Sequence, residues 1–375
     1  MKRLPKFSFI FFLLSTFFVL SSCEQKKNIS EFISTKEIDS EIFVNNAALF
    51  YKNGDISGVY SDYKTSSLKN FIIRDEEIGV SYVDKIYTET KRLNQLKYEF
   101  CHLLRNDVEY LFYNDFEKNN KIIFKTISRE IGENSWTVYP LKINPDEYFV
   151  FEALGKIILV YYEENLKIVS LNNYEIDENV QISENIKNIK NMKCIYDENL
   201  NILNLFYTDD INDLRLLKIE ISENSEGLTC KELSVVKIAS EIKLYDADTH
   251  NGSIRCVLYK EKDYSLSIFT ENAKKTLKIG YFVDIHSLKL KSLDKSTTIF
   301  YSSISLKENK EDSEEFYLGL VYDNPNKING GWKEEKLSIS KTPINSISLI
   351  EGDEKINILF GGGSLQLLEL KKDFF

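Results

Sequence analysis

A short run of residues that recurs seven times constrains the fold of this chain more than any other feature. Each run is aliphatic or β-branched, ends in an aromatic residue and is followed by a polar turn. The final aromatics are Tyr60, Tyr113, Tyr162, Tyr207, Tyr259, Tyr301 and Phe360. Successive aromatics lie 53, 49, 45, 52, 42 and 59 residues apart, a mean step of 50. A strand-rich repeat of this length is typical of the blades of a propeller.

The unit around Tyr259 shows how four strands fit into one repeat. We predict strands at residues 242–245, 253–260, 265–270 and 276–279, with Asn251-Gly252 as a hairpin turn. Ile254, Cys256 and Leu258 should share one face of the second strand, because side chains alternate along a strand. The sequence therefore predicts an all-β protein, a seven-bladed β-propeller, with a β-sandwich pair as the competing architecture.

The last unit provides only three strands before the chain ends, at residues 344–349, 355–360 and 364–370. An incomplete blade would leave an exposed sheet edge that can pair with other chains. We predict that residues 38–44, just before the first unit, add as the outer strand of the last blade and close the ring.

The composition supports strands and excludes some functions. The chain has 22 Tyr and 24 Phe but only six Ala, the best helix former. Its net charge of −10 argues against a nucleic-acid partner, which requires a basic face. No known blade signature occurs: Phe206-Tyr207-Thr208-Asp209 resembles the Tyr-Trp-Thr-Asp of one propeller class, but a single copy carries no weight.

The N-terminus has the features of an export signal. Residues 1–6 carry three positive charges, and residues 7–20 form an apolar run that is too short to span a membrane. The run ends in Leu20-Ser21-Ser22-Cys23. This pattern resembles a bacterial lipoprotein signal, and the Ile-, Lys-, Asn-, Phe- and Tyr-rich composition is similar to that of spirochaete (Borrelia-type) lipoproteins. The resemblance implies cleavage before Cys23 and lipidation of its thiol; a non-lipidated secretory signal is the alternative.

These features predict three segments. Residues 1–22 are a signal peptide, residues 23–37 are the lipidated Cys23 with a flexible tether, and residues 38–375 are the propeller. A flexible tether of this length reaches about 20 Å, and each buried methylene of the lipid contributes about 0.8 kcal/mol to anchoring. We expect a cell-envelope protein held by Cys23 at the outer membrane, on its periplasmic or its surface face.

Residue types that carry redox or metal chemistry are scattered. Cys101, Cys194, Cys230 and Cys256 lie in strand-like runs, where buried thiols are the first interpretation and a disulfide the second. The three histidines, His102, His250 and His286, form no ligand pair at metal-binding spacing. We therefore predict no metal site and no cofactor.

Two short motifs resemble functional loops and then depart from them. Residues 246–252 begin like a calcium loop, but His250 occupies its fifth position, so we interpret the segment as a turn between strands. Residues 362–366 nearly form a nucleophile elbow, but Gln366 replaces the second glycine and a strand follows. A tight turn is the better interpretation.

The acidic runs at residues 75–77 and 311–315 are interpreted as solvated turns, and Trp136 and Trp332 as packing residues of outer strands. The insertions at residues 307–315 and 323–331 are the best candidates for a contact surface.

These observations favour a protein-interaction scaffold over an enzyme. We predict a lipid-anchored, non-enzymatic propeller that binds other envelope proteins, for example as an accessory of outer-membrane protein assembly. The chain resembles the propeller-type lipoprotein of the β-barrel assembly machinery, in anchor, size and architecture only. The alternatives are a glycan-binding or hydrolytic propeller and a surface adhesin. Three or more carboxylates with aromatics on the central axis would favour the glycan propeller; lysine, asparagine and small residues would favour the scaffold.

Overall fold

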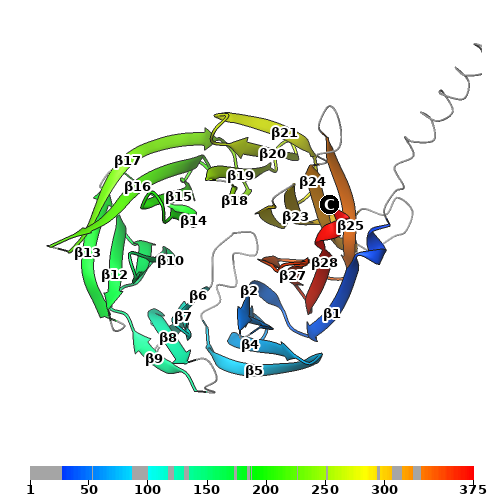
Figure 1. The fold of residues 1–375 in the computed structure, drawn as a ribbon, viewed down its shortest axis with the longest axis horizontal. Helices are drawn as coiled ribbons and strands as arrows, with labels where there is room; N and C mark the ends of the chain where they lie inside the picture. The colour runs from blue at the N-terminus through cyan, green and yellow to red at the C-terminus, as the bar shows by residue number, and fades with distance from the viewer. Residues whose placement is uncertain are drawn as a thin grey trace, which may run out of the picture.

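The computed structural model describes residues 28–52, 54–86, 100–116, 122–130, 135–172, 175–183, 186, 188–225, 227–250, 252–293, 296–305, 315–323 and 331–375. Within these ranges, seven four-stranded antiparallel sheets surround a central axis, so the chain is a seven-bladed β-propeller (Figure 1). The predicted fold is confirmed, and the β-sandwich alternative is wrong.

Six blades follow the chain in order, with the first strand innermost and the fourth outermost. Their strands are, in blade 1, β2 (Val44–Lys52), β3 (Asp55–Asp62), β4 (Ser67–Arg74) and β5 (Glu77–Lys85); in blade 2, β6 (Phe100–Arg105), β7 (Val108–Phe116), β8 (Ile122–Glu130) and β9 (Thr137–Pro140); in blade 3, β10 (Glu147–Ala153), β11 (Lys156–Tyr162), β12 (Leu166–Asn172) and β13 (Glu175–Ser183); in blade 4, β14 (Lys190–Asp197), β15 (Ile202–Thr208), β16 (Leu214–Asn224) and β17 (Gly227–Ala239); in blade 5, β18 (Leu244–His250), β19 (Ser253–Lys260), β20 (Ser265–Thr270) and β21 (Lys275–Tyr281); in blade 6, β22 (Ser287–Ser292), β23 (Thr297–Ser305), β24 (Glu315–Asp323) and β25 (Trp332–Ser340).

Blade 7 closes the ring with strands from both ends of the chain. It contains β26 (Ser346–Glu351), β27 (Lys355–Gly361), β28 (Leu365–Lys371) and, as its outer strand, β1 (Ile33–Asp39), which pairs antiparallel with β28 (Figure 1). Short 3-10 turns flank these strands at η1 (Ile29–Glu31) and η2 (Lys372–Phe374).

The predicted closure by an N-terminal strand is thus confirmed, but the predicted segment is wrong. The closing strand begins at Ile33 rather than at residue 38, so it includes residues 33–37, which we assigned to the tether. Val44 instead begins β2, the innermost strand of blade 1. An outer strand is exposed on one face, and most of the β1 side chains are polar, so β1 lacks the apolar run that marks the second strands.

The recurring aromatics all lie in the second strand of a blade. Residues of these strands are buried in unbroken runs, as in β11 and β15, because neighbouring blades cover both faces of each sheet. In β19, Ile254, Cys256 and Leu258 share one face, as predicted. They pack toward blade 4, while Val257 and Tyr259 pack toward blade 6. The hydrophobic core is therefore a ring of inter-blade layers.

Polar contacts join blade 1 to the outer strand of blade 7. The Tyr60 hydroxyl in blade 1 donates to the Asp39 carboxylate of β1 in blade 7. Lys69 Nζ lies 3.3 Å from Asp39 Oδ2 and 3.0 Å from Asp62 Oδ2. Burial alone would raise the pKa of Asp62, but hydrogen bonds from Thr65 and Lys69 lower it below the ordinary value.

Blade 2 repeats this arrangement one step around the ring. The Tyr113 hydroxyl donates to Asp84 of β5 in blade 1, and Lys125 forms ion pairs with both Asp84 and Asp115. A tyrosine and an aspartate two residues apart, with a lysine on the next strand, are thus a repeated contact between blades.

Candidate functional site: the axial pocket

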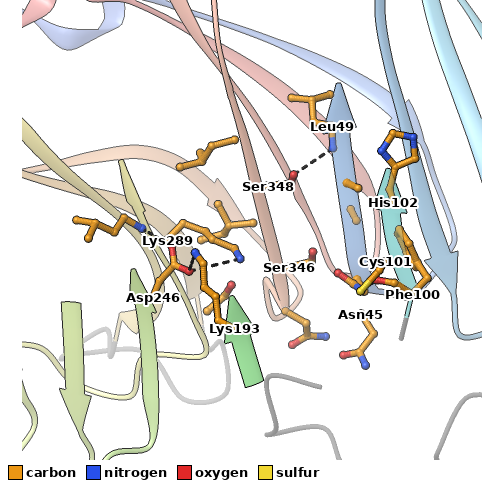
Figure 2. A pocket seen from close by; sticks show the side chains of 18 of the residues that line it. Asn45, Leu49, Phe100, Cys101, His102, Lys193, Asp246, Lys289, Ser346 and Ser348 are labelled. Carbon is orange, nitrogen blue, oxygen red and sulfur yellow. Dashed lines mark hydrogen bonds and ion pairs between the residues drawn. The ribbon is translucent and has the colours of Figure 1, made fainter. Parts of the chain in front are cut away.

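The innermost strands of all seven blades enclose a pocket of about 480 Å³ on the axis (Figure 2). The pocket lining mixes polar side chains with apolar ones such as Phe100, Phe149 and Leu244. Its described lining includes three lysines, three asparagines and three serines: Lys193, Lys289, Lys291, Asn45, Asn46, Asn345, Ser287, Ser346 and Ser348. Its carboxylates within the described residues are Asp246 and Asp248, both from β18.

Asp246 is the most strongly paired group of the pocket. Its Oδ1 accepts from Lys193 Nζ and lies 3.9 Å from Lys289 Nζ, and its Oδ2 accepts the Leu290 backbone N–H at 2.8 Å (Figure 2). The side chain is almost fully buried. Burial alone would raise the pKa of Asp246, but the two lysines and the Leu290 N–H together lower it below the ordinary value.

Asp248 continues the same contact two residues further along β18. Its Oδ2 accepts the Ser292 backbone N–H at 2.8 Å. Because alternate residues of a strand point to the same side, both aspartates reach alternate amides of β22 in the next blade. At another junction the Leu49 N–H of β2 donates to Ser348 Oγ of β26, at 3.1 Å (Figure 2). The pocket wall is therefore held by hydrogen bonds between first strands.

A buried polar chain leads outward from the pocket through blade 2. His102 stacks on Phe50, with ring centroids 4.0 Å apart, and its Nε2 lies 3.5 Å from Glu109 Oε1. Glu109 is fully buried and pairs with Arg129 Nη2 at 3.0 Å, while the Arg129 guanidinium lies 4.2 Å from the centre of the Trp136 ring. Burial would raise the pKa of Glu109, but His102 and Arg129 lower it to about 2.

The lipidation site and the three histidines that the sequence analysis singled out lie in different places. Cys23, the predicted lipidation site, lies outside the described residues. His102 and His286 line the axial pocket, whereas His250 ends β18. In the part of the chain that the structure describes, no three His, Cys, Asp or Glu side chains are grouped to hold a metal ion. In that same part, no helix is long and apolar enough to cross a membrane.

The cysteines have no disulfide partner in the described structure. Cys101, Cys194 and Cys256 are buried, Cys230 is half-buried, and all four are free thiols. Burial raises the pKa of Cys101 to about 12, so its thiol stays protonated at neutral pH.

The calcium-like segment was misread as a turn. Asp246 and Asp248 belong to strand β18, and the turn follows at Gly252, whose φ is 71°. The elbow-like segment is a tight turn, as predicted. A Cβ atom on Gly362 would lie 1.7 Å from the Pro343 carbonyl oxygen, so only glycine fits there.

The remaining candidates behave as packing residues or lie outside the described ranges. Trp136 stacks with Arg129 just before β9, and Trp332 begins β25, where it packs half-buried against the layer between blades 5 and 6. The run at residues 75–77 includes the turn between β4 and β5. Residues 307–314 and 324–330, the proposed contact insertions, lie outside the described residues, as does most of the acidic run 311–315.

Comparisons with known proteins find similar folds but identify no family. No protein-family model matches the chain, and no curated protein is similar to it. Solved structures of similar fold include the Trypanosoma rangeli sialidase, with 11% identity over 90% of this chain and 59% of that one, TM-score 0.49. YjhT is similar with 8% identity over 74% of this chain and 97% of that one, TM-score 0.46. A GH43_1 enzyme from Xanthomonas citri is similar with 7% identity over 73% of this chain and 86% of that one, TM-score 0.37.

These likenesses correct one prediction. We predicted that the chain is not an enzyme; solved structures of similar fold include enzymes, so the propeller fold gives no ground for that prediction, and it is withdrawn. At these identities the likeness shows the fold alone and assigns no reaction to this chain.

Proposed function

We propose that the protein is a lipid-anchored cell-envelope protein whose propeller binds other envelope proteins, with the axial pocket as the docking site for a polar loop or chain end. The lining of the pocket supports this proposal. It is rich in lysine, asparagine and small residues, which is the composition expected of a scaffold. The two aspartates of the lining already accept hydrogen bonds from lysines or backbone amides.

The anchor part of the proposal depends on the sequence around Cys23. A thioether-linked lipid would keep the propeller within a tether length of the membrane surface. Replacing Cys23 with Ala should move the protein from the membrane fraction to the soluble envelope fraction. Retention of the Cys23→Ala protein in the membrane fraction would contradict the anchor without affecting the fold.

The docking part is tested by filling the pocket. Ser346 lines the axis and is nearly buried (Figure 2), so Ser346→Trp should occupy the space that a partner needs. Ser225, an exposed residue in the turn between β16 and β17, gives the matched control Ser225→Trp. We expect cross-linking in intact cells to recover envelope proteins with the wild type and with Ser225→Trp, but not with Ser346→Trp. Equal recovery with Ser346→Trp, or no recovery with the wild type, would contradict the proposal.

A further inference from the structure

The lysines and carboxylates of the axial pocket all come from one side of the ring. Among the described lining residues they belong to β14, β18 and β22, the first strands of blades 4, 5 and 6. Blades 7 and 1 provide uncharged polar side chains instead, such as Ser346 and Asn45. Figure 2 shows Lys193 and Lys289 on one side of the pocket and Asn45 on the other. A charged wall therefore lies opposite a neutral polar wall.

The charged wall carries more positive than negative charge. Lys193 and Lys289 share the single carboxylate of Asp246. The pKa of that carboxyl is lowered below its ordinary value, so the group stays ionised at neutral pH. Together with Lys291 and Asp248, the described lining has three lysines against two aspartates, which gives a net charge of +1 from these side chains.

The ion pair that Lys291 forms behind the lining does not remove this excess. Lys291 Nζ lies 2.9 Å from Glu351 Oε2, and Lys372 Nζ lies 2.6 Å from the other oxygen of the same carboxylate. Counting both neighbours gives four lysines against three carboxylates, so the net charge remains +1.

This positive wall is a local exception in an acidic protein. The whole chain has a net charge of −10, whereas the axis has an excess of lysine. Field lines from charges in a cleft with walls of low dielectric constant are concentrated in the cleft, which raises the local concentration of ions of opposite charge. An anionic group is therefore attracted to the axis even though the protein as a whole repels it.

We propose that the axial pocket binds a carboxylate group of the partner protein, with the lysines of blades 4 and 6 as its counter-ions and the amide and hydroxyl groups of blades 7 and 1 as hydrogen-bond donors. This inference rests on the proposed docking function and names the chemical group that docks. A carboxylate matches the net charge of the wall, because it carries one negative charge, whereas a phosphate group carries nearly two. An acidic side chain and the C-terminus of a chain both provide such a group.

Calorimetric titration of the full chain in an uncharged detergent tests this proposal with three short peptides. An acetylated Ser-Asn-Gly-Asn peptide with a free C-terminal carboxylate represents a chain end. The amidated peptide Ser-Asp-Gly-Asn, also acetylated, represents an acidic side chain, and amidated, acetylated Ser-Asn-Gly-Asn is the uncharged reference. We expect at least one carboxylate peptide to bind in the millimolar range, at least about fivefold more tightly than the reference. The tighter of the two identifies the source of the carboxylate.

Two substitutions should shift the affinity for that peptide in opposite directions. Lys289→Gln removes one positive charge and leaves Asp246 paired with Lys193, so the affinity should fall at least about threefold. Asp248→Asn removes one negative charge and keeps an oxygen that can accept the Ser292 N–H, so the affinity should rise by about the same factor. A variant that had lost its fold would only bind more weakly, so an increase with Asp248→Asn reports the charge.

Lys262→Gln is the matched control and should leave the affinity unchanged. Lys262 is also ion-paired, with Glu241, but it lies in the turn between β19 and β20 and is not among the described lining residues of the pocket. Equal binding of all three peptides, no binding of either carboxylate peptide, or unchanged affinity in both Lys289→Gln and Asp248→Asn would overturn the proposal. If that happens while Ser346→Trp still prevents the recovery of envelope proteins in cells, the docking function stands and the carboxylate inference alone fails.

Discussion

Replacing Asp246 with Asn tests whether the lysine pairs of the axial pocket stabilise the ring. The substitution keeps the size of the side chain and an oxygen that can still accept the Leu290 N–H, but it removes the charge that Lys193 and Lys289 share. Removing one partner of a buried ion pair typically costs about 3–5 kcal/mol. The two lysine side chains are 19% and 24% exposed, so water can solvate part of their charge. We therefore expect a loss of about 2–3 kcal/mol in the free energy of unfolding.

Urea denaturation at neutral pH measures this loss, and Asp248→Asn is its matched control. Asp248 lies two residues along the same strand and accepts the Ser292 N–H, which an amide oxygen can also do. We expect Asp248→Asn to cost about 0.5 kcal/mol. Equal losses in the two variants would refute the reasoning, because the ion pairs of Asp246 would then contribute nothing beyond the hydrogen bond.

The pH dependence of the same variant provides a second check. The pKa of Asp246 is lowered in the folded protein, so the stability it contributes is present above the unfolded value of about 3.9 and is lost as the pH falls through the folded value. The stability difference between wild type and Asp246→Asn should therefore shrink below about pH 4.

Two further predictions concern other blades. Glu109 has a pKa of about 2 beside Arg129, so the free energy of unfolding of the wild type should fall by about 3 kcal/mol between about pH 4.5 and pH 2. The Glu109→Gln variant should lack this loss in an acid titration followed by circular dichroism. Gly319→Ala would place a Cβ atom 2.3 Å from the buried Tyr301 ring, so its melting should show a loss of about 1–3 kcal/mol. Gly79→Ala, where the nearest atom lies 3.6 Å away, should melt like the wild type. Identical acid titrations, or identical melting of the two glycine variants, would contradict the respective prediction.

The number of blades could be predicted from sequence because of where the second strands lie. These strands are covered by neighbouring blades on both faces, so they need continuous apolar runs, which can be recognised without an alignment. Strand β19 was predicted to the residue, and β20 likewise. The closing strand was placed five residues too late because outer strands such as β1 have polar, half-exposed side chains with no such run.

The axial pocket could not be predicted, because each blade contributes only a few lining residues and these lie tens of residues apart. Lys193, Asp246 and Lys289 come from three successive blades and meet only when these blades pack side by side. Asp246 and Asp248 were assigned to a turn because the calcium-like pattern fails at His250, whereas their alternation matches a strand that bonds to the next blade.

One sequence signal of the ring was available and was given no weight. The run ending in Tyr207-Thr208-Asp209 was treated as a single copy, but a tyrosine and an aspartate with one residue between them also occur at Tyr60 and Tyr113, in the same strand position. In blade 4 the aspartate pairs with Arg215, at 2.9 Å, as the equivalent aspartates pair with lysines in blades 1 and 2. The Tyr-x-Asp pattern therefore marks the ends of second strands where the aspartate pairs with a basic residue.

Closure of the ring by the N-terminal strand is the central claim, and an engineered disulfide between β1 and β28 tests it most directly. Ser34 and Glu369 are paired across these strands, so Ser34→Cys with Glu369→Cys should form a bond under mild oxidation, detected as a linked peptide by mass spectrometry. Ser34→Cys with Gln366→Cys lies three residues out of register and should not form one. Absence of the first bond, or equal formation of both, would contradict the closed seven-bladed ring.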